Sequence, residues 1–165
     1  MIRQKQRTDD KSAYEVALRL LGSREHSTFE LRTKLLRRGY SDSDIVATVA
    51  RLKLQDYLSD ERFTEAYIRF RLSRGDGPLK IRAQLLKRGI ENSLISKFLR
   101  NDESFWLTQA LAVDRRIHES PPVSEPHRTE QELRSRRARR LKNRGFPARI
   151  IATVLEGHSD LNQDL

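Results

Sequence analysis

A short pattern centred on a glycine occurs three times in this chain of 165 residues. The glycines are Gly39, Gly89 and Gly145, and each follows a basic residue and precedes a bulky apolar one. A glycine just beyond a helix can take the left-handed conformation that ends the helix. Each pattern therefore predicts a basic helix, a glycine turn and a second, amphipathic helix. The glycines are 50 and 56 residues apart, which indicates a diverged, irregular tandem repeat.

Apolar residues also recur at the same distances from the three glycines. The matched positions are Leu35, Leu85 and Leu141; Tyr40, Ile90 and Phe146; and Ile45, Ile95 and Ile151. One more helix is predicted before each pattern, because apolar residues with helical spacing precede it. These residues are Tyr14, Ala17, Leu18 and Leu21; Phe63, Ala66, Tyr67 and Phe70; and Trp106, Leu107, Ala110, Leu111, Val113 and Ile117. Triplets this small must stack to bury their faces. We predict an all-α fold of three tandem three-helix repeats stacked into an elongated, curved body.

Helix-start signals and composition set the predicted boundaries. The segments are a disordered basic arm (1–11), repeat 1 (12–57), repeat 2 (58–101), repeat 3 (102–157) and a tail (158–165). Ser27 with Glu30 has capping-box spacing, and Ser59 is a predicted N-cap. Residues 119–127 contain three of the five prolines, so they are predicted to form a loop inside repeat 3.

One residue breaks the repeat pattern. Arg137 stands at the position that Leu31 and Ile81 occupy in the first two repeats. Either the aliphatic stem of Arg137 covers apolar surface, or the local register of the third repeat shifts.

The net charge of +10 is concentrated in two places. Eight bases and no acid lie between residues 133 and 149, and the arm up to Lys11 carries a net charge of two. The rest of the chain is neutral. A charge run is usually a solvated face, but eight unopposed cations repel one another unless something anionic lies nearby. The eight are Arg134, Arg136, Arg137, Arg139, Arg140, Lys142, Arg144 and Arg149.

The sequence offers little for catalysis or metal binding. It contains no cysteine, and its four histidines lack metal-ligand spacing. Gly75 and Gly77 precede Lys80 without the complete phosphate-loop pattern, so a turn is expected there. We predict a non-enzymatic protein without metal or cofactor. No apolar run reaches membrane-span length and the N-terminus lacks a signal peptide's apolar stretch, so we expect a cytoplasmic protein.

A specific motif spans the end of the first repeat and the start of the second. Residues 55–67 read Gln-Asp-Tyr-Leu-Ser-Asp-Glu-Arg-Phe-Thr-Glu-Ala-Tyr. Further matching segments are Arg69-Phe70-Arg71, Gly77-Pro78, Lys80-Ile81 and Leu85-Leu86-Lys87-Arg88-Gly89-Ile90. With these segments, the chain resembles the RecX family of recombinase regulators over roughly residues 13–155. It departs from the family pattern at Ser59, where an acid is common, at Thr64, where Ala is common, and in the proline-rich insertion.

The resemblance implies a non-enzymatic modulator, mainly an inhibitor, of the RecA recombinase. Such proteins bind in the groove of the RecA–DNA filament and bridge neighbouring subunits, and they regulate recombination, DNA repair and the SOS coprotease activity. Some bind DNA directly. The partners implied here are the RecA filament and, weakly and without sequence preference, single- and double-stranded DNA. We expect a monomer.

Two groups of cations are candidates for contact with RecA or DNA. One group recurs at equivalent helix ends, where compensation of the helix dipole explains each residue equally well. Its members are Arg37, Arg38, Lys87 and Arg88. The other group, in the basic helix of repeat 3, is Arg136, Arg139, Arg140, Lys142 and Arg144.

Two alternatives stay open. A stand-alone, largely nonspecific DNA-binding protein using about four of these cations would show a salt slope near −3.6. The composition also permits a third possibility, a scaffold for another acidic partner.

Overall fold

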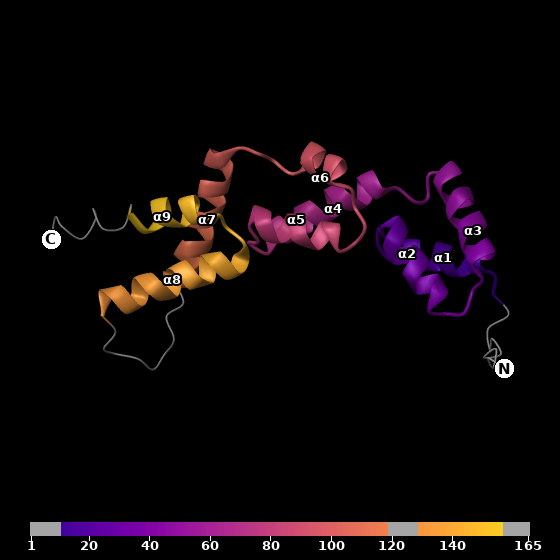
Figure 1. The fold of residues 1–165 in the computed structure, drawn as a ribbon, viewed down its shortest axis with the longest axis horizontal. Coiled ribbons are helices and arrows are strands. Elements are labelled where there is room, and N and C mark those ends of the chain that lie inside the picture. Colours follow the sequence, from indigo (N-terminus) through magenta and orange to yellow (C-terminus); the bar gives the residue numbers. More distant parts are fainter. Residues whose placement is uncertain (1–10, 119–128, 157–165) are drawn as a thin grey trace. The chain divides into compact units, whose positions relative to one another are not determined.

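The computed structural model describes residues 11–118 and 129–156, and all regular secondary structure in these ranges is helical (Figure 1). The helices within them follow one another in threes. They are α1 (Ala13–Leu21), α2 (Thr28–Leu36), α3 (Asp42–Leu54), α4 (Asp60–Ser73), α5 (Pro78–Leu86), α6 (Asn92–Phe98), α7 (Glu103–His118), α8 (Glu130–Arg144) and α9 (Ala148–Glu156). The all-α class with three-helix repeats is confirmed. The elongated, curved arrangement and the repeat boundaries stay predictions. Residues 1–10 of the arm, the 119–127 loop and the 158–165 tail lie outside the described residues.

The three repeat glycines have the same local structure. Gly39, Gly89 and Gly145 have φ of 81°, 74° and 87°, the left-handed region that favours glycine. Each glycine N–H bonds a carbonyl three residues back, and the next N–H bonds one five residues back. This pair of hydrogen bonds defines a Schellman motif, which satisfies carbonyls at the end of the helix. The same turn therefore ends α2, α5 and α8.

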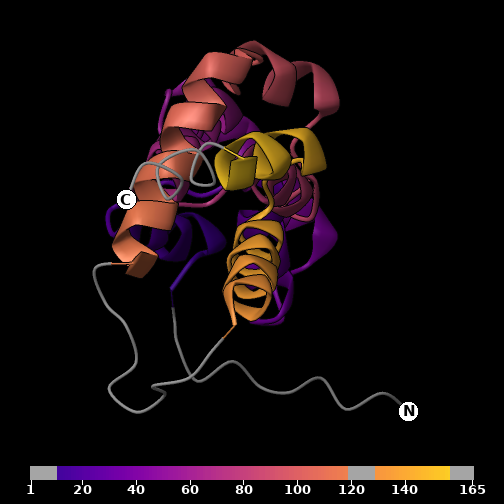
Figure 2. The ribbon, with the colours of Figure 1, turned by 90° about the vertical axis from the view of Figure 1, so that its left-hand side faces the viewer.

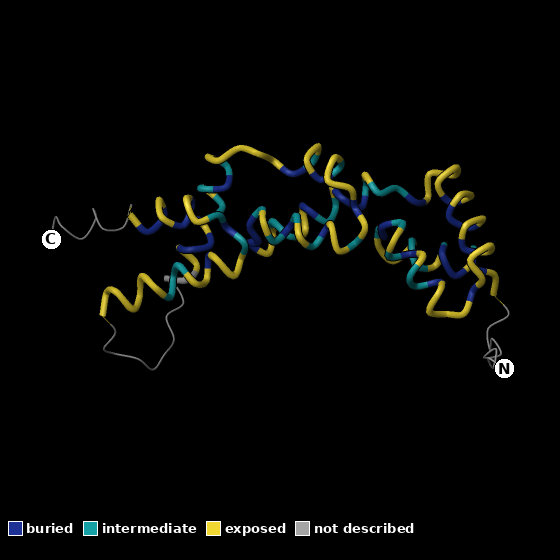
Figure 3. The backbone as a smooth tube through the Cα atoms, in the orientation of Figure 1, coloured by how far each residue is buried: buried dark blue, intermediate teal, exposed yellow. Residues whose placement is uncertain are grey.

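The described chain packs as two compact units. The first contains residues 11–67 and 85–95, and the second contains residues 68–84 and 96–156, apart from the gap at 119–128. Residues of α4, α5 and α6 belong to both units. In each unit, buried and exposed positions alternate along the helices, as amphipathic helices require (Figure 3).

The first unit buries one face of each of α1, α2 and α3. Its core residues are Ala13, Val16, Ala17, Leu31, Leu35, Tyr40, Ile45, Val49, Leu52 and Leu58. Ser27 caps α2 by accepting a hydrogen bond from the Glu30 N–H at 3.0 Å. The predicted capping box is only half formed, because the Glu30 carboxylate pairs with Arg24 and Arg88 instead.

In the second unit, α9 packs against both α7 and α8 (Figure 2). Trp106 of α7 is 3% exposed, and its indole N–H donates to the Arg100 carbonyl at 2.8 Å. Residues of α8, of α9 and of the turn between them complete this core. They include Leu141, Phe146, Ile150, Ile151, Val154 and Leu155.

Arg137 forms a long-range contact that the sequence did not reveal. Its guanidinium forms a two-bond ion pair with Asp114 of α7, in which Nε lies 3.0 Å from Oδ1. Asp114 is fully buried and the Arg137 side chain is 11% exposed. The register does not shift, because Leu141 and Phe146 are buried like their equivalents Leu35 and Tyr40. A buried ion pair replaces the apolar contact of the first two repeats.

Candidate anion-binding site

Helix α8 carries the densest positive charge in the described chain. Thr129 and Glu132 form a complete capping box at its start, and Leu141 is its buried residue. Most of its bases therefore point away from the core. Arg134, Arg139, Arg140 and Lys142 are exposed, Arg136 is half-buried, and no acid lies between residues 133 and 149.

The cations at the ends of α2 and α5 have different surroundings. Arg37 and Arg38 are exposed, and Arg38 donates to the Lys34 carbonyl of α2 at 3.1 Å. Lys87 is also exposed. Arg88 instead packs its guanidinium over the Tyr67 ring and pairs with Glu30 at 3.1 Å. Arg88 is thus committed to contacts inside the first unit.

Two neighbouring repeats meet within the first unit at what we call the first junction, formed by His26, Ser27, Glu30, Arg88 and Gly89. The Ser27 hydroxyl donates to the Arg88 carbonyl at 2.7 Å, which joins the start of α2 to the end of α5. His26 is 1% exposed, and burial lowers its pKa below the ordinary value of 6.5. The only carboxylate among these five residues, Glu30, neutralises Arg88.

The second junction, within the second unit, consists of Asp76, Gly77, Lys80, Arg144 and Gly145. Here the Gly77 N–H donates to the Arg144 carbonyl at 2.7 Å. A Cβ on Gly77 would lie 2.5 Å from the Gly145 carbonyl oxygen, so the two backbones touch. Asp76 is 2% exposed and pairs with Arg71, with Lys80 at 3.0 Å and, more loosely, with Arg144 at 3.8 Å.

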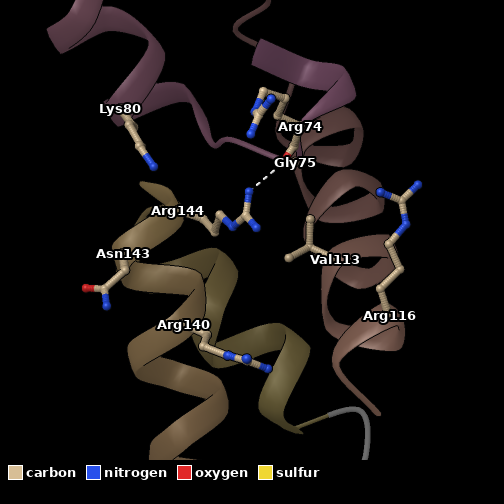
Figure 4. A pocket seen from close by; sticks show the side chains of 8 residues that line it. All are labelled: Arg74, Gly75, Lys80, Val113, Arg116, Arg140, Asn143 and Arg144. Carbon is tan, nitrogen blue, oxygen red and sulfur yellow. Dashed lines mark hydrogen bonds between the residues drawn. The ribbon is translucent and has the colours of Figure 1, made fainter. Parts of the chain in front are cut away.

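A cavity of about 410 Å³ opens beside the second junction (Figure 4). It is lined by Arg74, Gly75, Lys80, Val113, Arg116, Arg140, Asn143 and Arg144. Figure 4 shows Lys80 and Arg144 pointing into the space between α5, α7 and the end of α8, while the Asn143 amide points away. The Arg144 guanidinium also donates to the Arg74 carbonyl. Five of the eight lining side chains are cationic and none is acidic, so we call this the basic cavity.

The structure brings together only some of the predicted contact residues. Arg140 and Arg144 line the basic cavity, whereas Arg136 and Arg139 line a separate, more open hollow of about 670 Å³. Lys142 is exposed and lines neither of them. Arg37, Arg38, Lys87 and Arg88 belong to the other unit.

Three cations of the basic cavity were missed from the sequence. Arg74 and Arg116 had no feature to mark them, because only folding places the end of α4 beside α7 and α8. Lys80 did carry a signal. It stands at the repeat position of the acid Glu30, so the charge reverses there.

The described residues contain neither a metal-binding cluster nor a helix that could span a membrane. Within residues 11–118 and 129–156, no group of three or more His, Asp or Glu side chains could hold a metal ion. None of the helices in these ranges combines the length and apolar character that a bilayer crossing requires.

Comparison with known proteins decides the family. Models of the first and second three-helix domains of RecX match residues 13–52 and 59–99. A Legionella pneumophila protein named regulatory protein RecX is 36% identical over 145 residues, which cover 87% of this chain and 93% of that protein. This chain belongs to the RecX family.

Other relatives agree with this assignment. The regulatory protein RecX of Pseudomonas putida strain KT2440 is 36% identical over 141 residues, covering 86% of this chain and 87% of the relative. The crystal structure of RecX from Lactobacillus salivarius has a TM-score of 0.72 at 20% identity, over 88% of this chain and 93% of that one. This RecX-family chain is therefore a regulatory protein, not an enzyme.

Proposed function

We propose that this RecX-family chain is a modulator, mainly an inhibitor, of the RecA recombinase, and that it binds in the groove of the RecA–DNA filament in the bacterial cytoplasm. By doing so it would regulate recombination, DNA repair and the SOS coprotease activity. Family membership supports a regulatory role, and the exposed cations of α8 carry the proposal. These cations offer a positively charged surface to an anionic partner, and residues 133–149 contain no acid that would neutralise it.

The proposed mechanism needs binding alone. RecA subunits must rearrange as they hydrolyse ATP, and a ligand that binds one arrangement better shifts the population toward that arrangement. A chain of tandem helical repeats presents several surfaces and can contact more than one subunit of a filament. Stabilising one arrangement across subunits slows turnover without any chemistry by the regulator.

The direct test is the ATPase rate of preformed RecA filaments on single-stranded DNA. We expect the hydrolysis rate to fall as this protein is added and to level off at saturation. An unchanged rate at saturating protein would overturn the proposal. Strong binding to naked DNA together with an unchanged rate would favour the stand-alone DNA-binding alternative.

A pair of matched variants locates the contact surface. Arg139→Gln combined with Lys142→Gln removes two exposed charges from α8, and we expect several-fold more protein to be needed for half-maximal inhibition. Arg19→Gln combined with Arg32→Gln removes two exposed charges from α1 and α2, and inhibition should change little. Equal effects of both pairs would mean that net charge, and not α8, determines binding.

A further inference from the structure

The basic cavity contains more positive charge than the fold uses. Lys80 and Arg144 share the buried carboxylate of Asp76. By contrast, Arg74, Arg116 and Arg140 make no ion pair with a described residue. The Arg74 guanidinium lies 5.7 Å from the centre of the Phe70 ring of α4. An anion in the cavity would relieve the mutual repulsion of these cations.

The charge reversal between the junctions shows where this excess arises. In the first junction, the acid Glu30 lies 3.1 Å from Arg88 and neutralises it. The equivalent residues of the second junction are Lys80 and Arg144, two cations. The conserved geometry of the repeat thus places like charges side by side, and the one acid between them is also shared with Arg71. Lys80 also serves folding, because it lies 3.0 Å from the buried carboxylate of Asp76. The surplus charge therefore lies on the other cations of the cavity.

From these contacts we infer that the basic cavity binds phosphate groups of a DNA backbone. Four of its five cations are arginines, whose forked guanidinium matches phosphate oxygens geometrically. No aromatic side chain lines the cavity, so it lacks a platform on which a base could stack. The expected recognition is therefore of the backbone, without sequence preference.

A polymer explains the surroundings of the cavity better than a single ion does. Arg136, Arg140 and Arg144 are spaced four residues apart, so they lie along one side of α8, with a rise of about 6 Å between neighbours. Arg140 and Arg144 line the basic cavity, and Arg136 lines the hollow further along the helix. Such a row can meet successive charges of one strand. Only the choice of DNA as the source of the phosphates rests on the proposed function.

The test uses the full chain, without RecA, and a fluorescein-labelled oligo(dT) strand followed by anisotropy. Arg116→Gln combined with Arg140→Gln removes two cavity charges, both from exposed residues. The matched control, Arg69→Gln with Arg115→Gln, removes two exposed charges of the same unit, from α4 and α7, outside the cavity. We expect the cavity variant to bind about tenfold more weakly than the control, because hydrogen bonds to charged groups are the strong ones.

The salt dependence provides a second readout. Losing two phosphate contacts on single-stranded DNA should make the slope of log K against log salt shallower by about 1.4. Equal losses in both variants would overturn the inference. A cavity variant that loses binding to sodium tripolyphosphate but not to oligo(dT) would also overturn it, by assigning the site to free polyphosphate. The RecA ATPase assay is separate, so either proposal can fail while the other stands.

Discussion

The first and second junctions use the same acceptor carbonyl of the repeat but different donor groups. In both junctions, the donor residue stands twelve positions before one repeat glycine. The acceptor is the carbonyl of the residue just before the next repeat glycine. Ser27 makes this bond through its hydroxyl, and Gly77 makes it through its N–H. Because Gly77 has no side chain, the backbones in the second junction come close enough to touch.

The buried residue beside this contact differs as well. His26 occupies the position in the first junction, and Asp76 occupies it in the second. The neighbouring charge reverses from Glu30 to Lys80. One repeat geometry therefore supports a junction in which an acid neutralises its cation and a junction with surplus positive charge. The comparison teaches that the turn fixes the geometry, while the side chains around it determine whether the junction can bind an anion.

The largest predicted effect is that of Asp76→Asn. The change leaves Arg71, Lys80 and Arg144 together without their carboxylate. Breaking a buried ion pair by removing one partner costs 3–5 kcal/mol, and the lower end applies because Lys80 and Arg144 are partly exposed. We expect a loss of about 3 kcal/mol in the free energy of unfolding of the second unit. Trp106, the single tryptophan, reports this in urea denaturation.

Glu30→Gln is the control for Asp76→Asn, because it removes the acid of the first junction. Glu30 is more exposed than Asp76, with a side chain that is 17% accessible. Partly exposed pairs contribute about 1 kcal/mol or less, so the loss, followed by circular dichroism, should be no larger. Similar losses for the two variants would contradict the contrast between the junctions.

The second prediction concerns the close backbone contact. A Cβ on Gly145 would lie 2.5 Å from the Lys80 Cβ and 2.6 Å from its backbone nitrogen, whereas a Cβ on Gly39 would have nothing within 4 Å. Both glycines have φ above 80°. Gly39→Ala should therefore cost only the conformational term of about 1 kcal/mol.

Gly145→Ala adds a steric clash to the same conformational term, and we expect a loss of about 3 kcal/mol. Urea midpoints with their m-values provide the comparison. Equal losses for the two glycines would show that the second junction is not closely packed.

Much of the fold could be predicted because its signals are local. A glycine turn, an N-cap and apolar residues at helical spacing each report on a few adjacent residues. Gly39, Gly89 and Gly145 do end equivalent helices with the same hydrogen bonds. Ser27 likewise caps α2, as its spacing from Glu30 indicated.

The site was less predictable because it depends on long-range pairs. Nothing near Arg137 in the sequence indicates that it pairs with Asp114, which lies 23 positions earlier. Charge counting found Arg140 and Arg144, but it could not show that Arg74 and Arg116 join them in one cavity. It also could not separate Arg88, which forms contacts inside the first unit, from the exposed Arg37.

The smallest predicted effect is a pH dependence confined to the first junction. Burial lowers the pKa of His26, and the positive charges of Arg24 and Lys34 lower it further. A hydrogen bond to the Arg24 carbonyl and the negative charge of Glu30 raise the pKa, but the net shift is downward. Below about pH 6.5 the unfolded chain therefore takes up a proton that the folded chain resists, so stability present above that pH is lost as the pH falls. We expect the urea midpoint to drop between about pH 7.5 and about pH 5.5, and His26→Gln to reduce that drop. The second junction contains no histidine, so fluorescence of Trp106 should show a smaller change over the same range than circular dichroism does. A drop of the same size in His26→Gln would assign the pH dependence to other groups.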